Sequence, residues 1–153
     1  MSESLSQSVQ AICEKHGNDR TRLMDIVCDV QQQFGYVSGE AMDQIAAAIG
    51  AHRVEVQGVV TFYAFLSEEP KGKVVIRLCD DIIDKMHGVH DVAQVFREEL
   101  GIDFGETTPD GKISLEWTPC IGMCDQAPAA LVNDVVIPWL SSDNARRIVR
   151  EMR

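Results

Sequence analysis

The 153-residue sequence predicts an α/β protein in which an N-terminal helical bundle is followed by a small α/β domain with a mixed sheet. Two observations carry this prediction. Apolar residues recur with helical spacing through about the first 66 residues. After a polar segment that contains Pro70 and Gly72, short β-branched segments replace that pattern. We therefore expect a helical module over residues 1–68 and an α/β domain over residues 72–153.

The first part has the pattern of a small helical bundle. Four helices are expected, over residues 5–16, 22–34, 38–49 and about 53–62. The first three are followed by Gly17, Gly35 and Gly50, and glycine is the residue most common just after a helix. Asp19 and Ser38 precede helical segments and suit the N-cap position, because their side-chain oxygens accept free backbone N–H groups.

The second part alternates between strand and helix patterns. The expected order is a strand over 73–79, a helix over 88–100, a strand over 113–117, a hairpin formed by 130–132 and 135–137, and a helix over 142–152. The hairpin prediction rests on Asn133 and Asp134, which lie between two β-branched segments and are common turn residues. This order suits a small α/β domain.

Charge and hydropathy narrow the possible partners. The formal net charge is −10, and both parts are acidic, so nucleic acid and anionic membrane surfaces are poor partners. The polar N-terminus lacks the features of a signal peptide, and no apolar run approaches the length of a membrane span. We expect a cytoplasmic protein without membrane insertion that binds another protein.

The five cysteines are the main candidates for metal binding or redox chemistry. An odd number without a signal peptide favours metal binding or redox chemistry over disulfides. Cys120 and Cys124 form a C-x3-C motif in a loop, and Cys79 ends the first predicted strand. Thiolates on two loops of one domain could converge on zinc or an iron–sulfur centre. Cys13 and Cys28 lie in predicted helices and are interpreted as packing residues.

Three long segments resemble a known family. They are QQQFGYVSGEAMDQIAAAIG and VQGVVTFYAF in the helical part, and GETTPDGKISLEWTPCIGMCDQAPAALVND in the α/β part. The chain resembles the small thioredoxin-like [2Fe–2S] subunit of complex I (NADH dehydrogenase) and of related NAD-linked hydrogenases, formate dehydrogenases and electron-bifurcating complexes. The resemblance implies a thioredoxin-like ferredoxin domain, a [2Fe–2S] cluster, and electron transfer beside a flavin- and NAD(H)-binding partner subunit.

The chain departs from the family at one cluster ligand. The family pattern is C-x4-C followed, about 35 residues later, by C-x3-C. Carried over residue by residue, it implies that Cys79, Asp84, Cys120 and Cys124 bind the cofactor, with Asp84 in place of the usual cysteine. The sequence has no G-x-G-x-x-G fingerprint, so the dinucleotide is expected on the partner. The chain alone is expected to catalyse nothing beyond electron exchange.

Three interpretations of this departure stay open at the level of sequence. Asp84 could complete a [2Fe–2S] centre, because a carboxylate oxygen binds ferric iron. The cluster could be lost, leaving a structural subunit of the same kind of complex; the acidic pair Asp80 and Asp81 favours this, because carboxylates repel an anionic cluster. The site could instead bind zinc through its thiolates and either Asp84 or His87.

Overall fold

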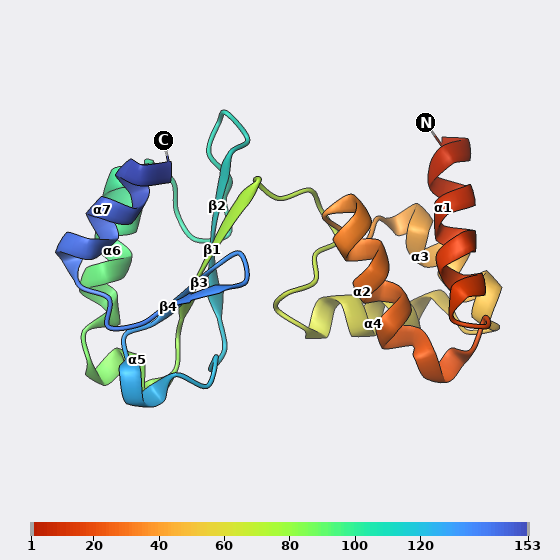
Figure 1. Ribbon diagram of the computed structural model, residues 1–153, viewed down its shortest axis with the longest axis horizontal. Helices are drawn as coiled ribbons and strands as arrows, with labels where there is room; N and C mark the ends of the chain where they lie inside the picture. The colour runs from red at the N-terminus through yellow and green to blue at the C-terminus, as the bar shows by residue number, and fades with distance from the viewer. Residues whose placement is uncertain (1, 153) are drawn as a thin grey trace. The chain divides into compact units, whose positions relative to one another are not determined.

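The computed structural model describes residues 2–152, with side chains from residue 5 onward (Figure 1). The chain forms two compact units, of which the first ends at Pro70 and the second begins at Lys71. The first unit is helical and the second combines helices with a sheet, so the predicted α/β fold class is confirmed. The limits of 1–68 for the helical module and 72–153 for the α/β domain stay a prediction.

The helical unit consists of four α-helices and one short 3₁₀-helix within the described residues. They are α1 (Ser2–Lys15), η1 (Arg20–Arg22), α2 (Leu23–Phe34), α3 (Gly39–Ile49) and α4 (Arg53–Phe62). The Ser38 hydroxyl caps α3 by accepting the N–H of Ala41 at 3.1 Å. Gly35 and Gly50 end α2 and α3 with left-handed backbone, at φ 80° and 65°, which costs glycine little.

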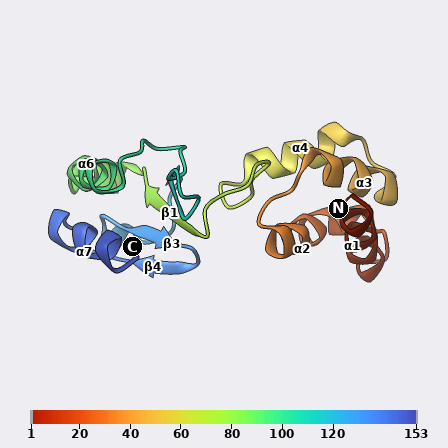
Figure 2. The same ribbon diagram turned by 90° about the horizontal axis from the view of Figure 1, so that it is seen from above.

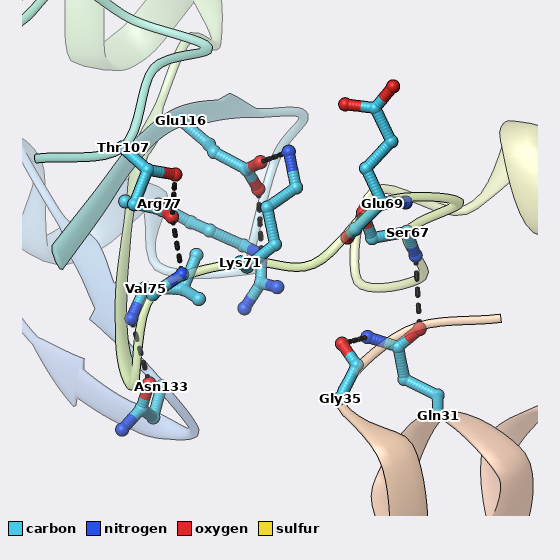
Figure 3. A network of polar contacts seen from close by, with 12 residues as sticks. Gln31, Gly35, Ser67, Glu69, Lys71, Val75, Arg77, Thr107, Glu116 and Asn133 are labelled. Atoms are coloured by element: carbon cyan, nitrogen blue, oxygen red, sulfur yellow. Dashed lines mark hydrogen bonds and ion pairs between the residues drawn. The ribbon is translucent and has the colours of Figure 1, made fainter. Parts of the chain in front are cut away.

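Apolar side chains from all four α-helices form the core of this unit. Its largest fully buried members are Val9, Ile26, Val27, Val30, Val37, Met42, Ile45 and Val56. Gln31 fastens the chain that leaves the bundle: its Oε1 accepts the N–H of Ser67 at 3.1 Å, and its Nε2 donates to the carbonyl of Gly35 at 2.8 Å (Figure 3). The end of α2 and the segment after α4 are therefore held together.

The second unit contains a four-stranded mixed sheet in the order β2-β1-β3-β4. The strands are β1 (Val74–Cys79), β2 (Ile113–Thr118), β3 (Ala130–Val132) and β4 (Val135–Ile137). Strand β1 runs parallel to β2 and antiparallel to β3, and β3 and β4 form the predicted hairpin. The central position of β1 matches its apolar, β-branched sequence.

Helices α6 (Val89–Leu100) and α7 (Ser142–Met152) lie beside one another against the sheet (Figures 1 and 2). Their inward faces and the sheet share a core whose fully buried members include Ile76, Leu78, Phe96 and Leu115. On β1, the residues between these core positions point to the other face of the sheet. There Glu116 pairs with Lys71 at 2.6 Å and lies 3.6 Å from Arg77 (Figure 3).

In the second unit, two short elements are not expected from the sequence: α5 (Ile82–Met86) and η2 (Cys124–Gln126). Helical periodicity needs a longer window than three to five residues to be visible. Each element contains one candidate metal ligand, Asp84 in α5 and Cys124 in η2. Among the described residues, no helix is both long and apolar enough to cross a bilayer.

Candidate metal centre

The parallel pairing of β1 and β2 brings two cysteine-bearing loops to one edge of the sheet. Cys79 ends β1 and lies opposite Thr118, which ends β2. Because parallel strands end at the same edge, the loop that begins at Asp80 and the loop that begins at Pro119 leave the sheet side by side. The backbone N–H of Asp80 donates to the carbonyl of Thr118 at 2.9 Å and fastens the two loops together.

The second loop presents two exposed thiols, those of Cys120 and Cys124. Their sulfur atoms lie 3.4 Å apart. Gly122, between them, has φ 78°, a left-handed conformation that lets the loop turn back so sharply. The Asp81 side chain faces this pair, with its Oδ2 3.8 Å from Cys124 Sγ. One ligand atom from each of Asp81, Cys120 and Cys124 falls within 4.8 Å of the others.

Cys79 is buried at the end of β1 and is not part of this group of three. Its Sγ is 3.9 Å from the carbonyl oxygen of Pro119, the residue before Cys120. Burial, with a smaller contribution from a hydrogen bond to Asp84, raises the pKa of the Cys79 thiol to about 11. Without a metal this thiol stays protonated at neutral pH, so metal binding there must release its proton.

Asp84 is also buried, with 1% of its surface exposed. Its Oδ1 accepts the backbone N–H of Ala129 at 2.9 Å. The carbonyl of Ala129 in turn accepts the N–H of Cys79 at 3.1 Å. Asp84 therefore ties α5 to the segment entering β3, and its carboxylate is outside the group formed by Asp81, Cys120 and Cys124.

Asp81 supplies the negative charge of the exposed group. Hydrogen bonds from the Ile82 N–H and from the thiol of Cys120 lower the pKa of Asp81, so this carboxylate stays ionised. The hydrogen-bonded Cys120 thiol, burial and the nearby Asp81 carboxylate raise the pKa of Cys124 to about 11. Lys85 pairs with Asp80 at 3.0 Å and offsets part of the charge. A cation at this place would offset the charge of Asp81 and lower the pKa of the Cys124 thiol.

The donor set fits a thiolate-bound metal or an iron–sulfur cluster. The two loops supply three sulfur donors, Cys79, Cys120 and Cys124, which is the ligand type that holds such clusters. Two nearby carboxylates, those of Asp81 and Asp84, could provide a fourth donor. The family pattern indicates Asp84; that assignment stays a prediction.

The remaining predicted candidates lie elsewhere or have other contacts. Cys13 is buried in the core of the helical unit and Cys28 is half-buried in α2. The Nδ1 atom of His87 donates to the carbonyl of Ile83 at 2.8 Å, as a residue closing α5 does. From the sequence, Asp81 counts only as a source of negative charge. The signal for its place at the site is its position just after a strand that runs parallel to the strand before the C-x3-C loop.

A sheet and helices arranged in this way, with thiols at the ends of two parallel strands, define a thioredoxin-like domain with an iron–sulfur type of donor set. The model of the thioredoxin-like [2Fe–2S] ferredoxin family matches residues 9–153. The chain belongs to this family, and the resemblance drawn from its sequence is confirmed.

Relatives occur in hydrogenases that reduce NAD or NADP and in NADH-quinone oxidoreductases. The chain is 35% identical over 149 residues to the alpha subunit of the NAD-reducing hydrogenase HoxS of Cupriavidus necator, covering 97% of this chain but 25% of that subunit. It is 32% identical to a subunit of the NADH-quinone oxidoreductase of Pseudomonas aeruginosa, covering 88% of this chain and 81% of the relative. The NADP-reducing hydrogenase subunit HndA of Solidesulfovibrio fructosivorans is 31% identical, with 95% of this chain and 82% of the relative covered.

A solved structure supports the fold. A crystal structure of NAD⁺-reducing [NiFe]-hydrogenase in its H₂-reduced state matches with a TM-score of 0.69 at 24% identity. The match covers 82% of this chain and 22% of the hydrogenase chain. The predicted thioredoxin-like architecture is thereby confirmed, whereas this chain spans about a quarter or less of these two NAD-reducing hydrogenase chains.

Proposed function

We propose that this chain is the electron-transfer subunit of a multisubunit NAD(H)-linked oxidoreductase. It would carry a [2Fe–2S] cluster on Cys79, Cys120, Cys124 and one carboxylate, with Asp84 as the carboxylate that the family pattern indicates. The observation that carries the proposal is that Cys79 and the close pair Cys120 and Cys124 lie where two paired parallel strands end, in a member of a [2Fe–2S] family.

The bound cluster would supply one-electron exchange. The burial of the chain's own residues determines from which side of the site electrons can be exchanged. Cys79 and Asp84 close the inner side of the site and keep water from it, because both are buried. Cys120 and Cys124 are exposed. Electrons would therefore enter and leave on the side of the C-x3-C loop, where a partner can approach.

Exposed apolar residues near the site support contact with a partner protein. Ile82 and Met86 lie on α5 and are exposed, Met86 by 75%, and Trp139 is exposed after β4. Large exposed apolar side chains are typical of protein-binding surfaces. The helical unit has its own aromatic cluster, in which Tyr63 contacts Phe62 and Phe65 at ring-centroid distances of 5.0 and 5.5 Å.

The partner that fits is a flavin- and NAD(H)-binding subunit. The names of the relatives connect them to NADH or NAD, whereas this sequence has no G-x-G-x-x-G fingerprint for the dinucleotide. A flavin accepts a hydride as an electron pair and passes on single electrons, which is the step that a one-electron carrier needs.

The test uses the chain purified anaerobically both alone and with its partner. Adding NADH to the complex should reduce the cluster, as measured by electron paramagnetic resonance, and adding it to the chain alone should have no effect. Reduction of the isolated chain by NADH, or flavin bound to it at full occupancy, would refute the division of roles.

A second candidate is a cluster-free structural subunit of the same kind of complex. The specific observation in its favour is the crowding of carboxylates, since Asp80, Asp81 and Asp84 all lie on the segment that follows Cys79. Carboxylates disfavour an anionic cluster through charge repulsion. A complex that oxidises NADH but holds no iron in this chain would select this candidate.

A further inference from the structure

The exposed group formed by Asp81, Cys120 and Cys124 has the geometry of a metal site of its own. We propose that the chain, when it carries no cluster, binds one zinc ion through these three side chains, and that Cys79 and Asp84 take no part. Water would fill the fourth position, as it does in zinc sites with three protein ligands. This inference does not depend on the proposed function, because it concerns the cluster-free chain.

The three side chains lie at separations that one zinc ion can bridge. Bonds of about 2.3 Å to sulfur and 2.0–2.2 Å to oxygen put tetrahedral donors roughly 3.6–3.8 Å apart. The two sulfur atoms are 3.4 Å apart, and Cys124 Sγ lies 3.8 Å from Asp81 Oδ2. The Cys120 thiol is also hydrogen-bonded to the Asp81 carboxylate. Each member of the group therefore contacts the other two, and zinc binding needs only small shifts.

The donor set suits zinc rather than a hard cation. Two of the three ligands are thiols, whereas magnesium and calcium prefer sites made of oxygen ligands alone. The N–H of Ile82 donates to the Asp81 carboxylate, so this ligand has a fixed support on the chain. Both thiols are exposed, so a metal ion reaches them directly from solvent.

Cys79 and Asp84 form a separate, buried pair. Their exposed fractions are 2% and 1%, and the Cys79 thiol is hydrogen-bonded to the Asp84 carboxylate. That carboxylate also accepts the N–H of Ala129 at 2.9 Å, so both side chains have partners in the protein without a metal. Cys79 is not among the donors that lie within 4.8 Å of one another in the exposed group. A single ion in that group therefore leaves the buried pair intact, whereas a two-iron cluster would have to engage Cys79 as well.

The test titrates the full-length chain, purified without metal under reducing conditions, with cobalt(II). The absorption bands of cobalt(II) report tetrahedral geometry and thiolate ligands, and zinc added afterwards should displace it. One cobalt ion should bind per wild-type chain. Asp81→Asn and Cys124→Ser should each weaken binding at least about 10-fold, whereas the matched controls Asp80→Asn and Cys79→Ser should leave it within about threefold.

X-ray absorption of the zinc-loaded chain counts the ligands. The wild type should show two sulfur neighbours, with oxygen in the remaining positions. Three sulfur neighbours would place Cys79 in the site and overturn the proposal. So would wild-type affinity in Asp81→Asn, or the absence of cobalt binding in the wild type. Should Cys79→Ser fail to fold, Asp84→Asn replaces it as the control for the buried pair, because its amide oxygen still accepts the N–H of Ala129.

Reconstitution with iron and sulfide separates this inference from the proposed function. If the wild type takes up neither, the proposed cluster fails, while the cobalt titration still decides on the zinc site. If the wild type forms the cluster but Asp81→Asn binds cobalt as tightly as the wild type does, the zinc site fails and the proposed cluster stands.

Discussion

Replacing Asp84 with alanine should destabilise the second unit, whether or not a metal is bound. The substitution removes the acceptor of the Ala129 N–H, and both residues are buried. A buried donor left without a partner costs about 1–3 kcal/mol. Because Ala129 also accepts the N–H of Cys79, the change should loosen the end of β1 as well. We expect a loss of about 2 kcal/mol in the free energy of unfolding.

Urea denaturation of the metal-free chain, followed by circular dichroism, measures this loss. Asp84→Asn should keep most of the stability, since its amide oxygen can still accept the hydrogen bond. Asp80→Ala is the surface control: it removes a partly exposed pair with Lys85, so it should cost less than about 1 kcal/mol. The reasoning is refuted if Asp84→Ala unfolds at the wild-type urea concentration, or if Asp84→Asn is as unstable as Asp84→Ala.

Three further predictions concern packing, backbone and pH. Phe96→Ala should lower the free energy of unfolding by about 3–5 kcal/mol, because Phe96 is fully buried. The control Phe62→Ala, at a side chain exposed by 79%, should change the free energy of unfolding by less than about 0.5 kcal/mol in the same urea assay. Gly72→Ala should destabilise the second unit, as shown by a lower melting temperature, because a Cβ there would lie 2.7 Å from a backbone carbonyl oxygen just before β2. Hydrogen bonds from Lys15 and His16 lower the pKa of Asp29. The ionised Asp29 carboxylate therefore stabilises the fold above its unfolded pKa of about 3.9, and this stabilisation is lost as pH falls through the lower folded value. Asp29→Asn should therefore be destabilising at pH 7, by less than about 1 kcal/mol, and close to neutral near pH 2; an equal effect at both would contradict this.

Much of the fold follows from local sequence signals. The predicted ranges for α4 and for both hairpin strands match the structure to the residue. There the apolar periodicity and the turn residues agree with the packing. Helix α5 is not predicted from the sequence, because five residues cannot show a helical period. Its first residue, Ile82, is also apolar but exposed, so it does not mark a buried face.

The cysteine ligands of the site can be predicted from the sequence, whereas the carboxylate ligand is harder to predict. Strand order alone places Cys79 near the C-x3-C loop, because β1 and β2 are parallel neighbours. The spacing of the family pattern then selects Asp84. The face on which a side chain lies depends on where α5 begins, and that start is not visible in the sequence. Less than one turn of helix separates the half-buried Asp81 from the fully buried Asp84.

The central claim is that this chain carries a [2Fe–2S] cluster, and iron and acid-labile sulfide in the anaerobically purified complex test it most directly. We predict two irons and two sulfides per chain assignable to this subunit, with loss of both when Cys120 and Cys124 are replaced by serine. A complex that is fully assembled and oxidises NADH, yet has the same iron and sulfide content with and without these two thiols, would contradict the account.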